Sequence, residues 1–253
     1  MPVALALIGG GRMGEALLRG LLTAGWSAAE VAVVEVSAER AAELRAAHPG
    51  LAVAAEAPAA DAAVVAVKPG DVPDACRAAT AGGAKRLLSI AAGVPIARLE
   101  ESAGPGVAVL RAMPNTAALV GQAASALAAG PSAGPADEEW AAGVLGAVGR
   151  VVRVPERLMD AVTGLSGSGP AYVFLVAEAL IDGGVAAGLP RDASVQLTVQ
   201  TLLGAARLLA ETGDTPEALR AMVTSPGGTT AAGLRVLESR VVRAAFIDAV
   251  AAA

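Results

Sequence analysis

The sequence contains few of the side chains that usually carry catalysis or hold metals. Cysteine occurs once, as Cys76, and histidine once, as His48. One cysteine excludes an internal disulfide and a cysteine-based metal cluster. No group of histidine or carboxylate residues has metal-ligand spacing, so we expect no metal site. His48 lies in a His48-Pro49-Gly50 turn that is typical of a surface helix C-cap, which disfavours acid–base catalysis by histidine.

Aromatic and charged residues are also scarce. Aromatics make up 2% of the chain and charged residues 17%, whereas 55% is hydrophobic, and the net charge is −5. An acidic chain does not favour nucleic acid or an anionic membrane as a partner. The uncharged stretch 112–136 is interrupted by prolines and polar residues, unlike a membrane-spanning helix. With no signal-peptide pattern at its start, the sequence predicts a cytoplasmic protein whose excess apolar surface is buried in an oligomer.

Up to residue 155, short apolar runs alternate with stretches of helical pattern. These runs show no polar alternation, which is typical of parallel strands buried on both faces. We therefore predict an α/β fold in which residues 1–155 form a Rossmann-type, doubly wound dinucleotide-binding domain. The predicted strands are Val3–Ile8, Val31–Val36, Ala62–Val67, Arg86–Ile90, Val107–Arg111, Ser125–Ala128 and Arg150–Val154, with helices that include Glu15–Ala24, Ala38–Ala47 and Asp137–Val148.

Residues 156–253 have the pattern of a second, all-helical domain. The helices predicted there are Tyr172–Asp182, Asp192–Thr212, a helix that begins after the N-cap Thr215, Thr230–Glu238 and Val241–Ala253. The first of them is expected to stop at Gly183-Gly184. They are too apolar to be satisfied inside a bundle of this size. We therefore expect the second domain to bind substrate and to dimerise with a partner chain.

A glycine-rich turn follows the first predicted strand. Glycines at positions 9, 11 and 14 fit the pattern G-x-G-x-x-G, and a helix continues from Glu15. Gly9 allows a tight turn, Gly11 lets the backbone approach a pyrophosphate, and Gly14 lets the helix lie close to the strand. With Arg12 and Met13, these glycines form the start of a helix, whose free N–H groups and dipole favour a bound phosphate. The segment therefore predicts a dinucleotide-binding site.

Two opposite signals follow the second predicted strand. Glu35 lies at the distance from the glycines where an acidic residue binds the ribose 2′-hydroxyl of NAD. Ser37 and Arg40 follow it, and they could instead hold the 2′-phosphate of NADP. The residues also allow a third interpretation, in which Glu35 and Arg40 are simply solvated.

Three later segments end strands at the same edge of the sheet, where ligands bind in open α/β folds. Asn115 is an attractive partner for a nicotinamide carboxamide, although it could equally cap a turn. Lys68 could face the coenzyme or only solvent. The candidate residues on these segments are Ala66, Val67, Lys68, Pro69, Ala92 and Asn115.

A hydroxyl-rich and glycine-rich segment, Thr224–Thr230, directly precedes a predicted helix. Hydroxyls and glycines at a helix start can hold a small carboxylate, although a plain capped loop has the same pattern. The chain has no obvious general acid, which fits hydride transfer to an electrophile that is already polarised, such as an imine.

These residues together resemble the pyrroline-5-carboxylate reductase family. The segments that carry the resemblance are the glycine turn, Ala66-Val67-Lys68-Pro69, Met113-Pro114-Asn115-Thr116, Leu165 to Tyr172 and, most specifically, Val223 to Leu234. The resemblance implies reduction of 1-pyrroline-5-carboxylate to L-proline, the last step of proline biosynthesis. It also implies NADP as coenzyme, with NAD possible.

The resemblance also implies roles for the second domain. Ser225 and the backbone of Gly228, Thr229 and Thr230 would hold the substrate carboxylate, and Thr230 would place its hydroxyl near the ring nitrogen as the catalytic residue. The family's intertwined homodimers, which can assemble further, place this loop against the nicotinamide of the other chain. The chain departs from many relatives at Val53-Ala54-Ala55-Glu56, where they have an asparagine for the adenosine ribose.

Three other functions fit the residues less well. A β-hydroxy-acid dehydrogenase would need a catalytic lysine in the second domain, and residues 155–253 contain none. A nucleotide-sensing regulator would not need the hydroxyl-rich carboxylate site. A bare helical scaffold would leave the glycine turn unexplained.

Overall fold

The computed structural model describes residues 2–253 and divides into two compact units, one ending at Gly167 and one running from Ser168 to Ala253. The boundary placed at residue 155 on sequence grounds therefore lies before the structural division. Met159 is fully buried in a core of the first unit. The two units are described separately below.

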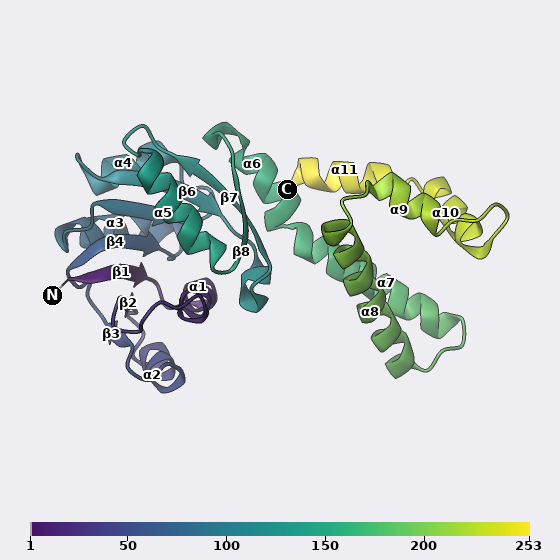
Figure 1. Cartoon of the computed structure of the whole chain (residues 1–253), viewed down its shortest axis with the longest axis horizontal. Helices are drawn as coiled ribbons and strands as arrows, with labels where there is room; N and C mark the ends of the chain where they lie inside the picture. Colours follow the sequence, from purple (N-terminus) through teal and green to yellow (C-terminus); the bar gives the residue numbers. More distant parts are fainter. Residues whose placement is uncertain (1) are drawn as a thin grey trace. The chain divides into compact units, whose positions relative to one another are not determined.

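The first unit is built on one eight-stranded sheet, with the strand order β3-β2-β1-β4-β5-β6-β7-β8 (Figure 1). All neighbouring strands are parallel except β6 and β7. The strands are β1 Val3–Ile8, β2 Val31–Val34, β3 Ala52–Ala54, β4 Ala60–Val65, β5 Arg86–Ser89, β6 Ala108–Met113, β7 Ala123–Ala129 and β8 Gly149–Arg153.

Helices cover both faces of this sheet, because its strands are apolar on both sides. In β1, Leu5 and Leu7 enter the core beneath α1, α2 and α5, while Ala6 and Ile8 enter the core beneath α3 and α4. This arrangement confirms the doubly wound fold. The helices are α1 Arg12–Thr23, α2 Ala38–Ala47, α3 Val72–Ala81, α4 Ile96–Ala103 and α5 Pro135–Gly146.

The expectation of parallel pairing throughout was wrong at one place. Strand β7 runs antiparallel to β6. The connection, residues 114–122, is too short for the crossover that a parallel neighbour requires. It contains only the short 3-10 helix η2 Thr116–Val120 and turns back at Gly121, whose φ is 69°.

The second unit consists of five helices, α7 Gly169–Ala186, α8 Arg191–Glu211, α9 Pro216–Met222, α10 Thr229–Ser239 and α11 Val242–Ala252. The predicted cap at Thr215 is confirmed, because its side chain accepts a hydrogen bond from the Ala218 N–H at 3.3 Å. The predicted stop at Gly183-Gly184 was wrong. A Cβ on Gly184 would lie 2.2 Å from Ser194 Oγ of α8, so this glycine serves close helix packing.

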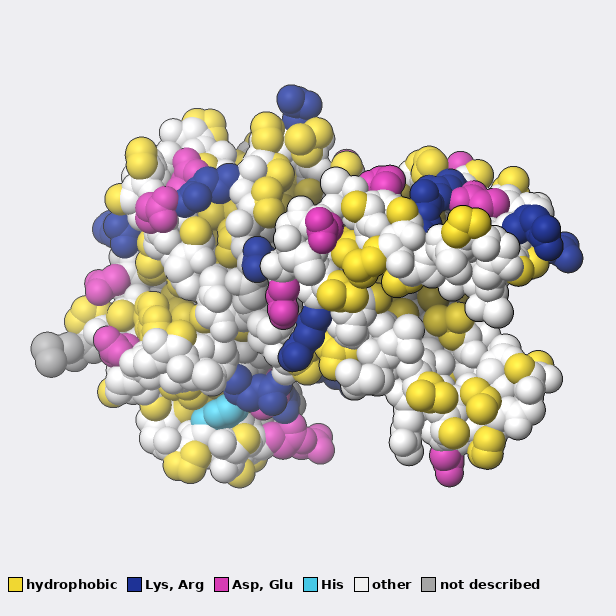
Figure 2. All heavy atoms as spheres, turned by 45° about the vertical axis from the view of Figure 1, so that its right-hand side comes forward, with side chains coloured by type: hydrophobic (Ala, Val, Ile, Leu, Met, Phe, Trp, Pro, Cys, Tyr) yellow, Lys and Arg dark blue, Asp and Glu magenta, His cyan; other side chains and the backbone are white. Residues whose placement is uncertain are grey.

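The second unit has almost no interior of its own. Within residues 168–253 only Ser194 and Thr198 are buried, and both are polar. Large apolar side chains such as Phe174 and Leu175 are 62% and 66% exposed, and Figure 2 shows many hydrophobic side chains on this surface.

The helical stretch Glu156–Ala186 is long and apolar enough to cross a membrane by length and composition alone.

A partly buried ion pair holds the segment that follows β8. Arg111 of β6 is only 8% exposed, and its Nη1 lies 3.1 Å from Glu156 Oε1. The same carboxylate oxygen accepts a hydrogen bond from the Ile96 N–H at 2.6 Å. Glu156 therefore joins β6 to the start of α4.

Replacing Glu156 with alanine should lower the free energy of unfolding by about 1–3 kcal/mol, because Arg111 would stay buried without its partner. Urea unfolding at one fixed protein concentration measures this. The matched control is Glu101→Ala, which removes an exposed pair with Arg98 and should change stability by about 0.5 kcal/mol or less. Equal effects of the two substitutions would contradict the structural role of Glu156.

Candidate active site

The turn between β1 and α1 requires glycine at two positions. Gly9 has a φ of 109°, and a Cβ on it would lie 2.5 Å from the Ala66 carbonyl oxygen. A Cβ on Gly14 would lie 2.0 Å from the Gly9 carbonyl oxygen. These contacts agree with the tight turn and the close helix approach expected of the two positions.

Gly11 differs from the other two glycines because open space surrounds it. It is the N-cap residue of α1, and a Cβ built on it would meet nothing within 4 Å. Arg12 and Met13 then begin the helix, whose first N–H groups have no acceptor within the helix. The arrangement leaves an open helix N-terminus at the carboxyl edge of the sheet, suited to a pyrophosphate.

Glu35 contacts the glycine turn directly. Its Oε2 accepts a hydrogen bond from the Gly10 N–H at 3.1 Å, and its Oε1 accepts one from the Ser37 N–H at 2.8 Å. Its carboxylate is therefore not simply solvated. The Ser37 hydroxyl caps α2 by accepting from the Arg40 N–H at 3.3 Å.

Arg40 braces the same turn from the other side. Its Nε donates to the Gly10 carbonyl oxygen at 2.9 Å, and its Nη1 pairs with Glu43 Oε2 at 2.7 Å. Its Nη2 pairs with Glu15 of α1. The carboxylates of Glu43 and Glu15 raise the pKa of Arg40, and the hydrogen bond from Arg40 is the largest cause of the lowered pKa of Glu15.

His48 caps α2 as predicted, but its expected surface position was wrong. The side chain is only 10% exposed, and its Nε2 lies 3.4 Å from Glu15 Oε1. The imidazole therefore belongs to the group of side chains that holds α1 and α2 together.

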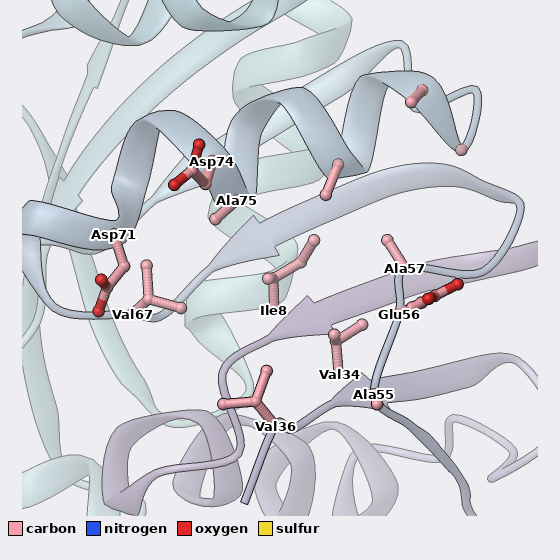
Figure 3. A pocket seen from close by; sticks show the side chains of 13 residues that line it. Ile8, Val34, Val36, Ala55, Glu56, Ala57, Val67, Asp71, Asp74 and Ala75 are labelled. Carbon is pink, nitrogen blue, oxygen red and sulfur yellow. The ribbon is translucent and has the colours of Figure 1, made fainter.

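A cavity of about 710 Å³ lies between the ends of β1 and β2 and helix α3. Of the residues predicted on these strand ends, Val67 lines it, whereas Lys68, Pro69 and Ala92 are exposed. Figure 3 shows three acidic side chains in its wall, Glu56 from the segment after β3 and Asp71 and Asp74 from the start of α3. Sequence reasoning did not select these three.

The apolar part of this cavity is a suitable surface for an adenine ring. Val36, which directly follows Glu35, is 84% exposed and lines the cavity with Ile8 and Val34. An aliphatic wall can take the place of aromatic stacking, because aromatic residues make up only 2% of this chain. Val36 was not among the predicted site residues, although its position directly after β2 could have indicated a contact with the adenine ring.

Asn115 uses both ends of its side-chain amide within the first unit. Its Nδ2 donates to the Ser166 carbonyl oxygen at 3.0 Å, and its Oδ1 accepts from the Ala124 N–H at 3.3 Å. It thus connects β7 to a π-helical turn, Thr163–Gly167. Its side chain does not cap its own turn, and binding a carboxamide would require it to give up one of these contacts.

The segment Thr224–Thr230 forms a tight turn in front of α10. The Gly228 N–H donates to the Ser225 carbonyl oxygen at 3.1 Å, and Gly227 has a φ of 72°, as a type II turn with proline at its second position requires. The Gly228 N–H is therefore already used by the turn. Ser225, Thr229 and Thr230 are exposed, and their hydroxyls have no hydrogen-bond partner within residues 2–253.

Other kinds of reactive group are few in the described chain. Among residues 2–253, no group of three or more His, Cys, Asp or Glu side chains could hold a metal ion. Burial raises the pKa of the Cys76 thiol to about 11, so it is protonated near neutral pH.

An open helix N-terminus after the first strand of a doubly wound sheet, with a cavity beside it, is typical of a dinucleotide-binding protein. Two family models match the chain. One, for NADP oxidoreductases described as coenzyme F420-dependent, covers residues 4–93, and the other, for pyrroline-5-carboxylate reductase dimerisation, covers residues 156–253. The pyrroline-5-carboxylate reductase of a Synechocystis strain is 46% identical over 100% of this chain and 96% of the relative. The chain belongs to the pyrroline-5-carboxylate reductase family.

Further relatives agree with this membership. The reductase of Corynebacterium melassecola is 42% identical over 97% of this chain and 94% of its own. The solved structure of a Coxiella burnetii pyrroline-5-carboxylate reductase superposes with a TM-score of 0.92 at 34% identity, covering 100% of this chain and 96% of that one. A Plasmodium falciparum structure with NADP bound has a TM-score of 0.85 at 30% identity and covers 99% and 95%. The chain is therefore an oxidoreductase that uses a nicotinamide coenzyme.

The glycine turn generates a prediction that separates folding from binding. Gly11→Ala should cost about 1 kcal/mol of stability or less, since the position is open, but should raise the dissociation constant for NADH at least about tenfold by crowding the phosphates. Gly14→Ala should cost about 1–3 kcal/mol through its clash with Gly9. Thermal unfolding and fluorescence titration measure the two effects. Unchanged coenzyme affinity in Gly11→Ala would place the pyrophosphate elsewhere.

Proposed function

We infer that the chain reduces 1-pyrroline-5-carboxylate to L-proline with a reduced nicotinamide coenzyme. Family membership over the full length supports this reaction. The observation that carries it is the exposed start of α10, where Ser225, Thr229 and Thr230 lie beside a helix N-terminus that suits a small carboxylate.

The reaction converts the C=N bond of a cyclic imine into a secondary amine. A bound reduced nicotinamide supplies the hydride, which forms a new C–H bond at the imine carbon, while the electron pair of the C=N π bond moves to nitrogen and takes up a proton. The substrate is already polarised, so the protein's main tasks are to orient it and to hold a donor beside the nitrogen.

Thr230 is proposed as that donor. A threonine hydroxyl is far too weak an acid to act as a free proton source near neutral pH. It would instead hydrogen-bond to the ring nitrogen and relay a proton from water. Ser225 and the N–H groups of Thr229 and Thr230 would hold the carboxylate, while the Gly228 N–H keeps its place in the turn.

We also propose that the chain is a cytoplasmic homodimer that can assemble further and that binds neither nucleic acid nor membranes. The net charge of −5 supports the first exclusion. A partner chain would cover the exposed apolar side chains of the second unit, including those of α7. The description of the family model over residues 156–253 as a dimerisation region supports this assembly.

Either reduced coenzyme fits the proposed reaction. NADP was expected from the family resemblance, with NAD possible, and the NADP-bound Plasmodium relative supports NADP. The residues that line the adenosine end in this chain decide the balance between the two coenzymes.

Substitutions in the turn before α10 should separate binding from catalysis. Thr230→Ala should lower kcat about 100-fold, because its hydroxyl acts as hydride arrives, and Thr230→Ser should restore much of it. Ser225→Ala should mainly raise KM, because its contact is the same in the ground and transition states. Steady-state kinetics at 340 nm with pyrroline-5-carboxylate measures both, with Ser239→Ala at the far end of α10 as control. Wild-type kcat and KM in Thr230→Ala would refute the role.

A further inference from the structure

The adenosine end of the coenzyme site differs between NAD and NADP by one group, the 2′-phosphate. Near neutral pH a phosphate monoester carries about −1.5 to −2 charges. A site that accepts it needs a cation or free N–H groups at the end of β2. The residues found there in this chain are Glu35, Ser37 and Arg40.

Glu35 occupies the backbone donors that a 2′-phosphate would need. Its two carboxylate oxygens accept from the N–H groups of Gly10 and Ser37, at 3.1 Å and 2.8 Å. An additional anion would therefore meet a carboxylate where it needs donors. A ribose 2′-hydroxyl, in contrast, can donate a hydrogen bond to this carboxylate.

Arg40 carries the positive charge at this site, but its guanidinium already has three partners. Its guanidinium donates to the Gly10 carbonyl oxygen and pairs with Glu15 and Glu43. Two carboxylates thus neutralise the single positive charge. To bind a 2′-phosphate, Arg40 would have to leave the contact that braces the glycine turn.

The neighbouring cavity adds more negative charge. Its wall contains Glu56, Asp71 and Asp74, and the residues that line it include no lysine or arginine (Figure 3). Clefts lined by charge of one sign disfavour ligands of the same sign. The cavity therefore favours the coenzyme that carries the smaller negative charge at its adenosine end.

We propose that this enzyme prefers NADH to NADPH and that Glu35 is the residue that sets the preference. Glu35 would accept the ribose 2′-hydroxyl of NADH and repel the 2′-phosphate of NADPH. Arg40 serves as a positioning residue that holds the turn for both coenzymes. This inference rests on the proposed coenzyme site.

The test uses adenosine fragments that need no turnover. Calorimetry compares adenosine 5′-monophosphate with adenosine 2′,5′-bisphosphate, which differ only in the 2′-phosphate, and fluorescence titration compares NADH with NADPH. The wild-type enzyme should bind the fragment and the coenzyme without the 2′-phosphate at least about tenfold more tightly. Glu35→Gln should reduce this preference at least about tenfold, since it removes the charge and keeps the size of the side chain.

Two further variants identify the residue responsible. Glu39→Gln removes the same charge from an exposed position in the first turn of α2, and it should leave the preference within about twofold. Arg40→Gln should weaken both coenzymes to the same extent. A selective loss of NADPH binding in Arg40→Gln would instead make Arg40 a phosphate ligand and overturn the proposal.

The remaining outcomes are distinguishable. Equal binding of the two fragments to wild type, or tighter binding of the bisphosphate, overturns the preference and leaves the proposed reaction intact. An equal shift in Glu39→Gln overturns the assignment to Glu35. Failure of the folded protein to bind either coenzyme overturns the coenzyme site and this inference with it.

Discussion

The helical second unit lacks an interior, and the function proposed for this chain depends on how that lack is met. Only two polar residues are buried between Ser168 and Ala253, while large apolar side chains stay exposed along α7 and α8. Burial of apolar surface is the main favourable term in folding, so such helices need another apolar surface against them. Association with a second chain supplies that surface. It would also fix the turn before α10, whose hydroxyls are proposed to bind the substrate.

The first unit differs, because the turn proposed to bind the coenzyme is held by contacts within that unit. Gly9 and Gly14 allow contacts that no other residue permits. Hydrogen bonds from Gly10 to Glu35 and from Arg40 to Gly10 hold the turn in place, and Glu15 connects α1 to Arg40. A preorganised turn lowers the entropy lost on binding. The same bonds use up the donors and the cation that a 2′-phosphate would need, so one network supports both the site and its proposed coenzyme preference.

Much of this was predictable from sequence where local pattern decides the structure. Apolar runs and glycine spacing predicted the doubly wound sheet and the turn at Gly9 to Gly14, because both leave a recognisable local pattern even though the contacts they serve, such as that of Gly9 with Ala66, are distant in sequence. The antiparallel β7 was missed, since its direction depends on the length of the connection after Met113. Tertiary contacts also decide where Glu35, Asn115 and His48 point, and Gly184 serves helix packing that no local signal reveals. The segment Thr224–Thr230 could be selected from its hydroxyls and glycines, whereas the separate roles of Thr229 and Thr230 followed only from the family resemblance.

The central claim is that two chains together form each active site, one providing the coenzyme turn and the other the substrate turn. It is tested most directly with Gly11→Asp, which places a charge at the pyrophosphate position, and Thr230→Ala, each weakly active alone. The two variants are co-expressed with different tags, and mixed dimers are purified by both tags. If the sites are shared, one site of each mixed dimer contains neither substitution, and activity should recover to about half of wild type. Activity no greater than the residual level of the two parents would contradict the account.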